Sequence, residues 1–316
     1  MYLITGSAGF IGFHLSKSLI ERNKEVLGID NFSNYYDPKL KKNRNTILKK
    51  NKNYKFINFD LSKKKNFYKL NKYKDKIKII IHLAGQAGVR YSIKNPQSYI
   101  LNNPYAFINI LEFFKDSKSL ELISYASSSS VFGDKVQNSK INIPVSVYAA
   151  SKQSMESISN VYSHLYKIKI IGMRFFTVYG PWGRPDMSIY KFSKKIINQK
   201  QIEIYNYGNH ERSFTYIDDI VQNVLKMIKV ERKENIKFNN TISIGNPRSI
   251  KLMEIVKILE KYFNKKAIKT YLPLQPGDVK KTKANIKKET SKYGFVFKTQ
   301  IKDGIKKFIK WFNEKK

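Results

Sequence analysis

Tyr148 and Lys152 are the residues of this sequence whose types and spacing point most directly to chemistry. They lie four positions apart in SVYAASKQSMES, a segment that we predict to be helical, so both side chains share one face. An ammonium group beside a phenol favours the phenolate and lowers a pKa that is about 10 in isolation. Tyr148 would then serve as a general base near neutral pH. The serine hydroxyls of YASSSSVFG, just upstream at the end of a predicted strand, would complete a Ser-Tyr-Lys trio.

The stretch ITGSAGFIG places Gly6, Gly9 and Gly12 between the first predicted strand and the first predicted helix. Glycines in this context allow a tight turn and let the backbone approach a pyrophosphate at the amino end of the helix. Asp30 follows at the end of the next strand, where a carboxylate can bind the two ribose hydroxyls. The same carboxylate would repel the extra phosphate of NADP, so the sequence predicts NAD as the cofactor.

Short apolar runs alternate with longer segments of helical periodicity through the amino-terminal half. The runs that predict strands are 2–5, 25–30, 54–60, 78–85, 122–130 and 168–176, and stretches such as 11–23 and 99–117 predict helices. This alternation is typical of an α/β fold with a Rossmann-type, doubly wound parallel sheet. We expect an NAD-binding domain over residues 1–180, with returning segments near 214–246. Residues 181–316 would form a smaller, partly interleaved α/β lobe that binds the substrate.

The composition limits the class of protein. The chain has 316 residues, no cysteine and a formal net charge of +36, and its lysines are scattered through almost every segment. Scattered charge does not make a nucleic-acid site, so we expect no such partner, although a phosphate-bearing substrate would be attracted. No apolar run is long enough for a membrane span, and the start lacks a leader, which favours a cytoplasmic protein. The four histidines show no metal-ligand spacing, so we interpret them as structural and expect no metal.

On these motifs the chain resembles the extended short-chain dehydrogenase/reductase family of nucleotide-sugar epimerases and dehydratases, from Tyr2 to nearly the end. The resemblance implies that Ser128 is the catalytic hydroxyl beside Tyr148 and Lys152. It also implies that FDL flanks the adenine and that HLAGQAGVR lines the cofactor. With the glycine motif, the cofactor-binding residues are expected to be Gly6, Gly9, Phe10, Ile11, Gly12, Asp30, Asn31, Asp60, Leu61, Leu83, Ala84, Gln86, Asn103, Tyr148 and Lys152.

Ser129 and Ser130 bear on which reaction the family resemblance implies. Dehydratases of the family carry an Asp-Glu pair here, and the branch that makes UDP-xylose carries a glutamate just before the valine. Because this chain has only hydroxyls at these two positions, oxidation followed by re-reduction is the simplest chemistry left.

TVYGPWGRPDM and LAGQAGVRYSIKNP are most similar to the UDP-glucuronate 4-epimerases, in which the loop arginine binds the sugar carboxylate. Only eight of the 60 basic residues are arginines. A planar guanidinium held between Gly183 and Pro185 can meet a carboxylate through two parallel hydrogen bonds, which a lysine cannot do. The resemblance also assigns Arg212 to the diphosphate of a UDP-sugar, although Ser213 stands where relatives usually have aspartate. The expected substrate contacts are Arg90, Ser128, Ser129, Thr177, Arg184, Arg212, Asn246 and Asp278.

Three alternatives stay open at this point. A 4-epimerase of neutral UDP-hexoses would share every cofactor and catalytic residue, and the others are a UDP-glucuronate decarboxylase and a non-catalytic module that binds NAD or nucleic acid. By family analogy we expect a homodimer formed through the helices in 99–117 and 148–165, whose outer faces would expose apolar residues such as Phe107 and Phe113.

Overall fold

A seven-stranded parallel sheet forms the centre of the computed structural model, which describes residues 1–133, 142–235 and 240–314. The strand order is β11-β6-β5-β4-β1-β2-β3, and every neighbouring pair is parallel. The predicted doubly wound α/β fold is therefore confirmed. The strands are β1 (Tyr2–Thr5), β2 (Val26–Asp30), β3 (Tyr54–Asn58), β4 (Ile79–His82), β5 (Leu122–Ser128), β6 (Ile170–Phe175) and β11 (Thr241–Ile244).

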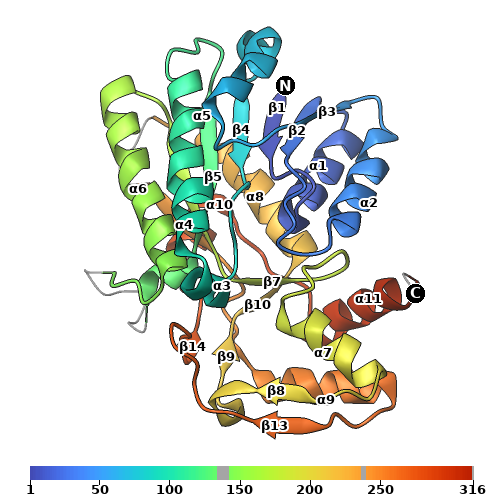
Figure 1. Ribbon diagram of the computed structural model, residues 1–316. Coiled ribbons are helices and arrows are strands. Elements are labelled where there is room, and N and C mark those ends of the chain that lie inside the picture. The colour runs from blue at the N-terminus through green and yellow to red at the C-terminus, as the bar shows by residue number, and fades with distance from the viewer. Residues whose placement is uncertain (134–141, 236–239, 315–316) are drawn as a thin grey trace.

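Helices cover both faces of this sheet (Figure 1). Successive residues of β1 point to opposite faces, so Ile4 joins the apolar core under α1 while Leu3 joins the core under α5. One layer contains α1 (Phe10–Glu21), α2 (Pro38–Lys49) and α8 (Ile217–Glu231). The other contains a 3₁₀ helix (Lys64–Lys76), α4 (Pro96–Ile100), α5 (Ala106–Phe114) and α6 (Val147–Tyr166).

The helix predicted over 99–117 is divided in the structure. α4 begins after Asn95, whose side chain accepts a hydrogen bond from the Ser98 amide, and a π-helical turn, Leu101–Tyr105, separates it from α5. Pro104 lies inside this turn. Because proline has no amide hydrogen, the regular helical ladder is interrupted here.

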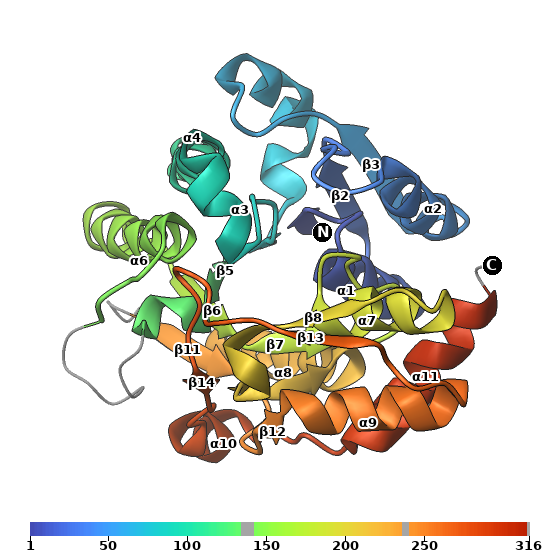
Figure 2. The ribbon, with the colours of Figure 1, turned by 60° about the horizontal axis from the view of Figure 1, so that its bottom comes forward.

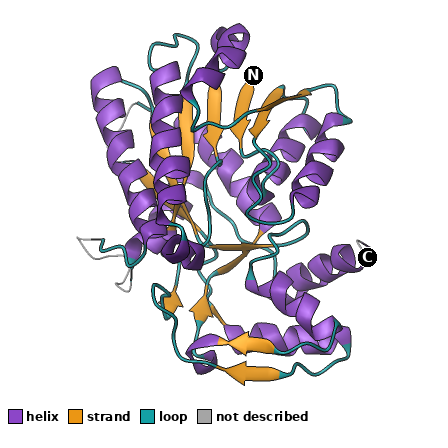
Figure 3. Ribbon diagram, in the orientation of Figure 1, coloured by secondary structure: helices purple, strands orange, loops and turns teal. Residues whose placement is uncertain are grey.

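A smaller group of elements follows Gly180 and lies at the end of the sheet where the strands have their carboxyl ends (Figures 1 and 3). Its helices are α7 (Ser188–Ile197), α9 (Leu252–Phe263) and α11 (Ile301–Glu314), whereas α10 (Lys287–Tyr293) packs on α8 beside the large sheet. Its short strands are β8 (Ile202–Ile204), β9 (Glu211–Arg212), β12 (Ile250–Lys251), β13 (Lys269–Tyr271) and β14 (Lys281–Thr282).

The chain crosses between the two groups more than once. β7 (Thr177–Tyr179) pairs with β10 (Phe214–Tyr216), after which α8 packs on α1 and β11 joins β6 at the edge of the main sheet. Figure 1 shows β7 and β10 between the large sheet and the small lobe, and Figure 2 brings the small lobe to the front. The predicted domain division, with its boundary at residue 180 and its returning segments near 214–246, stays a prediction.

Candidate active site

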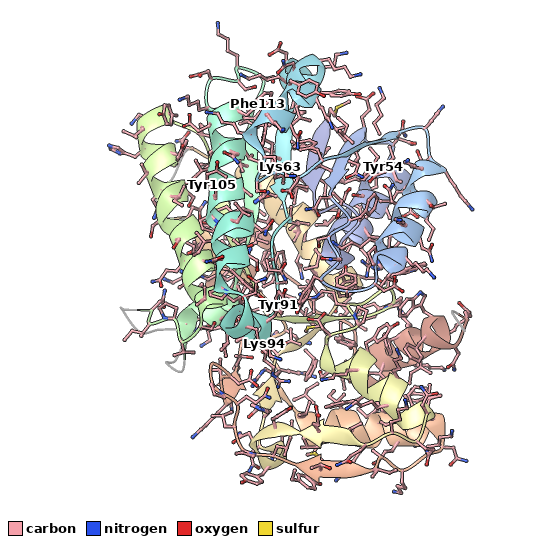
Figure 4. All side chains as sticks on the ribbon, viewed as in Figure 1. Tyr54, Lys63, Tyr91, Lys94, Tyr105 and Phe113 are labelled. Atoms are coloured by element: carbon pink, nitrogen blue, oxygen red, sulfur yellow. The ribbon has the colours of Figure 1, made fainter. Side chains whose placement is uncertain are left out.

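A cavity of about 820 Å³ opens at the carboxyl ends of β1, β2, β4 and β5, between the large sheet and the small lobe. Ligand sites of parallel α/β sheets form in this place because the loops after the strands diverge there. Tyr91 and Lys94, on the short helix α3 (Val89–Lys94), line the cavity and lie between the two groups of elements in Figure 4.

The glycine-rich loop after β1 has no room for side chains at two of its glycines. Gly6 has a φ of +68°, and a Cβ on it would lie 2.7 Å from the Ala84 nitrogen. A Cβ on Gly12 would lie 2.1 Å from the Gly6 oxygen, so no larger residue fits there. No side chain caps the start of α1, and its first turn contains no acidic residue. The free amides of this turn therefore suit a pyrophosphate, and the loop fits NAD.

The carboxylates expected to bind the adenosine half lie in the same cavity. Asp30 is buried, accepts a hydrogen bond from the Phe32 amide and has the Lys41 ammonium 3.6 Å away. Burial raises the pKa of Asp60, but hydrogen bonds from Ser62 and Asn31 outweigh it and hold this pKa below its usual value. Both groups are therefore placed as acceptors for hydroxyl groups.

Ser128, Tyr148 and Lys152 all line the cavity. Ser128 ends β5, where its hydroxyl accepts a hydrogen bond from the Ser130 amide at 3.1 Å. Tyr148 lies in the first turn of α6, which is capped by the Ser146 side chain, and Lys152 lies one turn further on. The structure thus brings the predicted trio together from one strand end and one helix.

Burial, rather than Lys152, has the largest effect on the pKa of Tyr148. It raises this pKa above the usual value of 10, and a hydrogen bond with Ser128 opposes this only in part. The Lys152 ammonium donates to the Ala126 carbonyl at 2.8 Å, and burial lowers its pKa to about 8. Because desolvation dominates both groups, the activation of Tyr148 by this lysine stays a prediction.

Arg184 lies in the cavity wall, in a tight loop in which the Gly183 amide bonds the Gly180 carbonyl. Its guanidinium makes two parallel hydrogen bonds to Asp186, at 3.0 Å from Nε and 2.6 Å from Nη2. The Tyr35 hydroxyl donates to the same carboxylate. Burial lowers the pKa of Arg184, but the charge and hydrogen bonds of Asp186, together with Tyr35 and Tyr36, outweigh burial and raise this pKa above its usual value. Asp186 therefore holds the guanidinium in place, beyond the stiffness expected from Gly183 and Pro185.

Arg44, on α2, joins the glycine loop to the Arg184 loop. It is fully buried and donates to the Ala8 carbonyl at 2.9 Å, to the Tyr36 hydroxyl at 3.0 Å and to the Trp182 carbonyl. Trp182 has a φ of +60°, in the left-handed region that non-glycine residues rarely adopt. The buried guanidinium thus fixes the two loops relative to each other.

The far end of the cavity contains the residues expected to bind the nucleotide of the substrate. The Arg90 guanidinium bonds the Asp278 carboxylate at 3.0 Å and covers the Tyr205 ring, with 4.4 Å to the ring centroid. Arg212 on β9 donates to the Lys280 carbonyl at 2.9 Å and to the His210 ring at 3.2 Å. Cations and acceptors therefore alternate where a diphosphate and a ribose would lie.

Two expected site residues are not part of the cavity wall. Asn103 is fully buried and braces the loop after β4, since its side chain bonds both backbone groups of Gln86. The Asn246 side chain accepts from the Arg248 amide and is used by its own turn. Every other expected cofactor or substrate residue contributes to the wall.

Among the wall residues that were not singled out from the sequence are Lys41, Tyr35, Asp186 and His210, each beside a predicted site residue. Asp186 follows Arg184 by two positions, and His210 precedes Arg212 by two, so each could have been suspected as a partner of a site arginine. Lys41 and Tyr35 approach through the tertiary fold, and no sequence signal marks them. The interpretation of all four histidines as structural needs correction for His210, which lies in the cavity wall.

Over residues 1–133, 142–235 and 240–314, no three histidine, aspartate or glutamate side chains gather as metal ligands do. Across the same described ranges, no helix combines the length and apolar character required to span a bilayer.

The chain belongs to the NAD-dependent epimerase/dehydratase family, which matches residues 2–245. An uncharacterized protein of Methanocaldococcus jannaschii is 48% identical over 99% of this chain and 96% of its own. A probable UDP-glucuronate 4-epimerase of Rhizobium meliloti is 37% identical over 99% of this chain and 97% of its own.

Among solved structures, the UDP-glucuronic acid 4-epimerase of Bacillus cereus in complex with UDP-glucuronic acid and NAD aligns with a TM-score of 0.90. It is 33% identical, and the alignment covers 100% of this chain and 99% of that one. The resemblance seen in the sequence is confirmed, and the cofactor of this family is NAD.

Proposed function

We propose that this protein interconverts UDP-glucuronate and UDP-galacturonate by epimerisation at C4. The observation that carries the proposal is the shared cavity: the Arg184 guanidinium, the Tyr148 hydroxyl and the glycine loop all line it. Solved and curated relatives named as UDP-glucuronate 4-epimerases support the same substrate. Ser129 and Ser130 supply no carboxyl group for a dehydration or for the decarboxylation known from the resemblance.

The reaction begins with loss of the proton on the sugar 4-hydroxyl. Tyr148 takes this proton as its phenolate, and Ser128 hydrogen-bonds the same oxygen to keep it aligned. The chemistry that bound NAD supplies is reversible acceptance of the hydride from C4. The positive charge of Lys152, on the same face of α6, stabilises the phenolate. The product of this half-reaction is a 4-keto sugar that stays tethered through its UDP group.

Arg184 has two tasks in this scheme. A guanidinium has five N–H donors, so the two bonds to Asp186 leave three for the carboxylate of the sugar. The 4-keto intermediate is a β-keto acid and can lose carbon dioxide. Loss of carbon dioxide requires the bond between C5 and the carboxylate to align with the π orbitals of the ketone. By fixing the carboxylate, Arg184 keeps this bond out of that alignment. After the keto sugar rotates, re-reduction of its other face gives the epimer, and Tyr148 returns the proton.

The test is product analysis with purified protein, NAD and UDP-glucuronate. We expect UDP-galacturonate as the main product and little UDP-pentose. UDP-glucose and UDP-N-acetylglucosamine serve as neutral comparison substrates. Equal kcat/KM for UDP-glucose and UDP-glucuronate would favour the neutral-hexose alternative. In that case Arg184 would serve only as the ion-pair partner of Asp186 and would not select the acidic sugar.

We also propose that the protein is a cytoplasmic homodimer whose product serves polysaccharide synthesis. Phe107 cannot contribute to the interface as expected, because it is buried in the core, and Phe113 packs on Phe67. The exposed apolar residues of the same helices support the proposal instead. They are Ile100, Leu101, Tyr105, Val161 and Leu165.

A further inference from the structure

His210 lies between the two residues that are proposed to bind the nucleotide, Arg212 and Asp278. It immediately precedes β9, only 5% of its surface is exposed, and it lines the nucleotide end of the cavity. Neither the proposed reaction nor the family resemblance gives this imidazole a role.

Arg212 lacks the neighbouring aspartate that relatives usually have, because Ser213 occupies that position. Ser213 points elsewhere: its hydroxyl accepts from the Ala284 amide at 3.0 Å. The guanidinium is held by backbone carbonyls of Glu211, Val279 and Lys280 and by the His210 ring. His210 is thus the one side chain among these four supports.

The contact with Arg212 also fixes the protonation of the ring. A guanidinium can only donate, so the Nδ1 atom of His210, 3.2 Å from Nη2 of Arg212, must accept. The ring is therefore neutral, with its proton on Nε2. Burial and the Arg212 charge both lower the pKa of His210, which favours this neutral form.

The Nε2 side of the ring faces the second proposed nucleotide contact. It is 4.0 Å from the Asp278 carboxylate, which also accepts from Arg90 at 3.0 Å. This separation is too long for a direct hydrogen bond but allows an electrostatic attraction between the N–H and the carboxylate. One imidazole thus touches Arg212 and faces Asp278 on opposite edges.

We infer that His210 is a positioning residue for the nucleotide: it holds the Arg212 guanidinium through Nδ1, beside the Asp278 carboxylate. It takes over the support that an aspartate beside Arg212 would give. The inference rests on the proposed function, since the ligand that it concerns is uridine diphosphate.

The experiment compares His210→Phe with His210→Asn by calorimetric titration with UDP. The Asn side-chain oxygen lies near the Nδ1 position and can still accept from Arg212, whereas Phe preserves only the ring shape. We expect UDP to bind about tenfold more weakly to His210→Phe, the loss expected for one hydrogen bond from a charged group, and within about threefold of the parent to His210→Asn. The exposed His164 of α6 provides the control, His164→Phe, with unchanged affinity.

Steady-state kinetics and melting temperatures separate positioning from folding. In His210→Phe we expect KM for UDP-glucuronate to rise in parallel with the UDP dissociation constant while kcat changes less than threefold, because the reacting carbon lies at the other end of the site. Equal UDP affinity in His210→Phe and parent overturns the inference. An equal loss of UDP affinity in His210→Phe and His210→Asn also overturns the inference, because it would indicate that His210 contributes only packing. If the parent itself does not bind UDP, the proposed function fails instead.

Discussion

Arg184 meets two carboxylates in the proposed reaction, Asp186 of its own loop and the hexuronic acid of the substrate. Its paired hydrogen bonds to Asp186 fix the plane of the guanidinium before the sugar arrives. A guanidinium that is already oriented loses less entropy on binding. The same pairing neutralises much of its charge, so geometry rather than net attraction selects the acidic sugar.

We predict that Arg184→Lys and Arg184→Ala weaken recognition of UDP-glucuronate to different extents. Lysine keeps the charge but loses the planar fork, so KM should rise about tenfold, and further in the alanine variant. The share of UDP-pentose among the products should increase in both. Chromatography of the products after complete conversion measures this share. An Arg184→Ala enzyme with no more UDP-pentose than the parent would contradict the protective role.

Lys152 gives a pH-dependent prediction. Burial lowers its pKa in the folded protein to about 8, against 10.5 for a free lysine. The unfolded chain therefore binds more protons between these values, and the free energy of unfolding should increase as pH rises through this window. From pH 7.5 to 9.5 we expect a gain of about 2 kcal/mol from this group.

Urea denaturation at the two pH values measures this gain, and Lys152→Met is the matched variant. It removes one titrating group while the other lysines, mostly on the surface, still titrate in both proteins. The difference between parent and variant isolates Lys152. Parallel pH dependence in both proteins would show that its pKa is not lowered on folding.

At the residue scale, motif spacing selected Tyr148, Lys152, Gly6 and Arg184, and all four line one cavity, while their roles stay predictions. Motif spacing could not reveal Lys41 beside Asp30, because Lys41 comes from the following helix. It also could not show how far Tyr148 and Lys152 are removed from water, because spacing shows only that two groups are neighbours.

The strand and helix that carry the trio are joined behind it through Glu156. Glu156 of α6 accepts two hydrogen bonds from Arg174 of β6, at 2.8 and 2.7 Å, and a third from Ser127 of β5. Both side chains of the Glu156–Arg174 ion pair are mostly buried. The ion pair therefore ties α6, which positions Tyr148, to β6, and the Ser127 hydrogen bond ties it to the end of β5, which positions Ser128.

We predict that Glu156→Gln destabilises the fold by about 3 kcal/mol, because it leaves the Arg174 charge buried without its partner. kcat should fall as well, since α6 is no longer held at β5. The double variant Glu156→Gln with Arg174→Met should recover part of the stability. Chemical denaturation and initial rates measure both effects, and a double variant less stable than the single one would contradict this explanation.

At the scale of elements, alternating apolar runs predicted the strands of the large sheet, since buried parallel strands are apolar throughout. The division of the 99–117 helix was not predicted, although Pro104 is visible in the sequence. Apolar periodicity continues across the turn, and only the missing amide hydrogen distinguishes it. The short strands of the small lobe, two or three residues each, carry too little pattern to predict.

The surface of the whole molecule offers one face suited to self-association. Val161 and Leu165 of α6 are 52% and 61% exposed and lie one turn apart, and Tyr105 is exposed on the π-helical turn that packs on α6. Exposed apolar residues on adjacent elements mark interaction surfaces. An equivalent pair of helices from a second copy would cover them.

We predict that Val161→Glu combined with Leu165→Glu prevents the proposed dimer from forming, because paired copies would bury four unpaired carboxylates. Light scattering after size exclusion measures the mass. Ile268→Glu, at a 53% exposed position of the small lobe, is the control and should leave the mass unchanged. A parent protein that is already monomeric would refute the dimer.

The net charge of +36 is a property of the molecule rather than of one patch, and the fold explains how it is tolerated. Of the described lysines, all but Lys41 and Lys152 are exposed or half-buried, while buried cations such as Lys41 and Arg44 have defined acceptors. Composition alone could not separate these two groups, because burial depends on the tertiary fold.

Arg44 finally bears on how such an enzyme can be redesigned. The Arg44 guanidinium donates hydrogen bonds to backbone carbonyls of both the glycine-rich loop and the loop that contains Arg184. A shift of one loop would therefore displace the other. Engineering the protein to accept a different dinucleotide would thus also retune its sugar preference, and the two traits would have to be selected jointly.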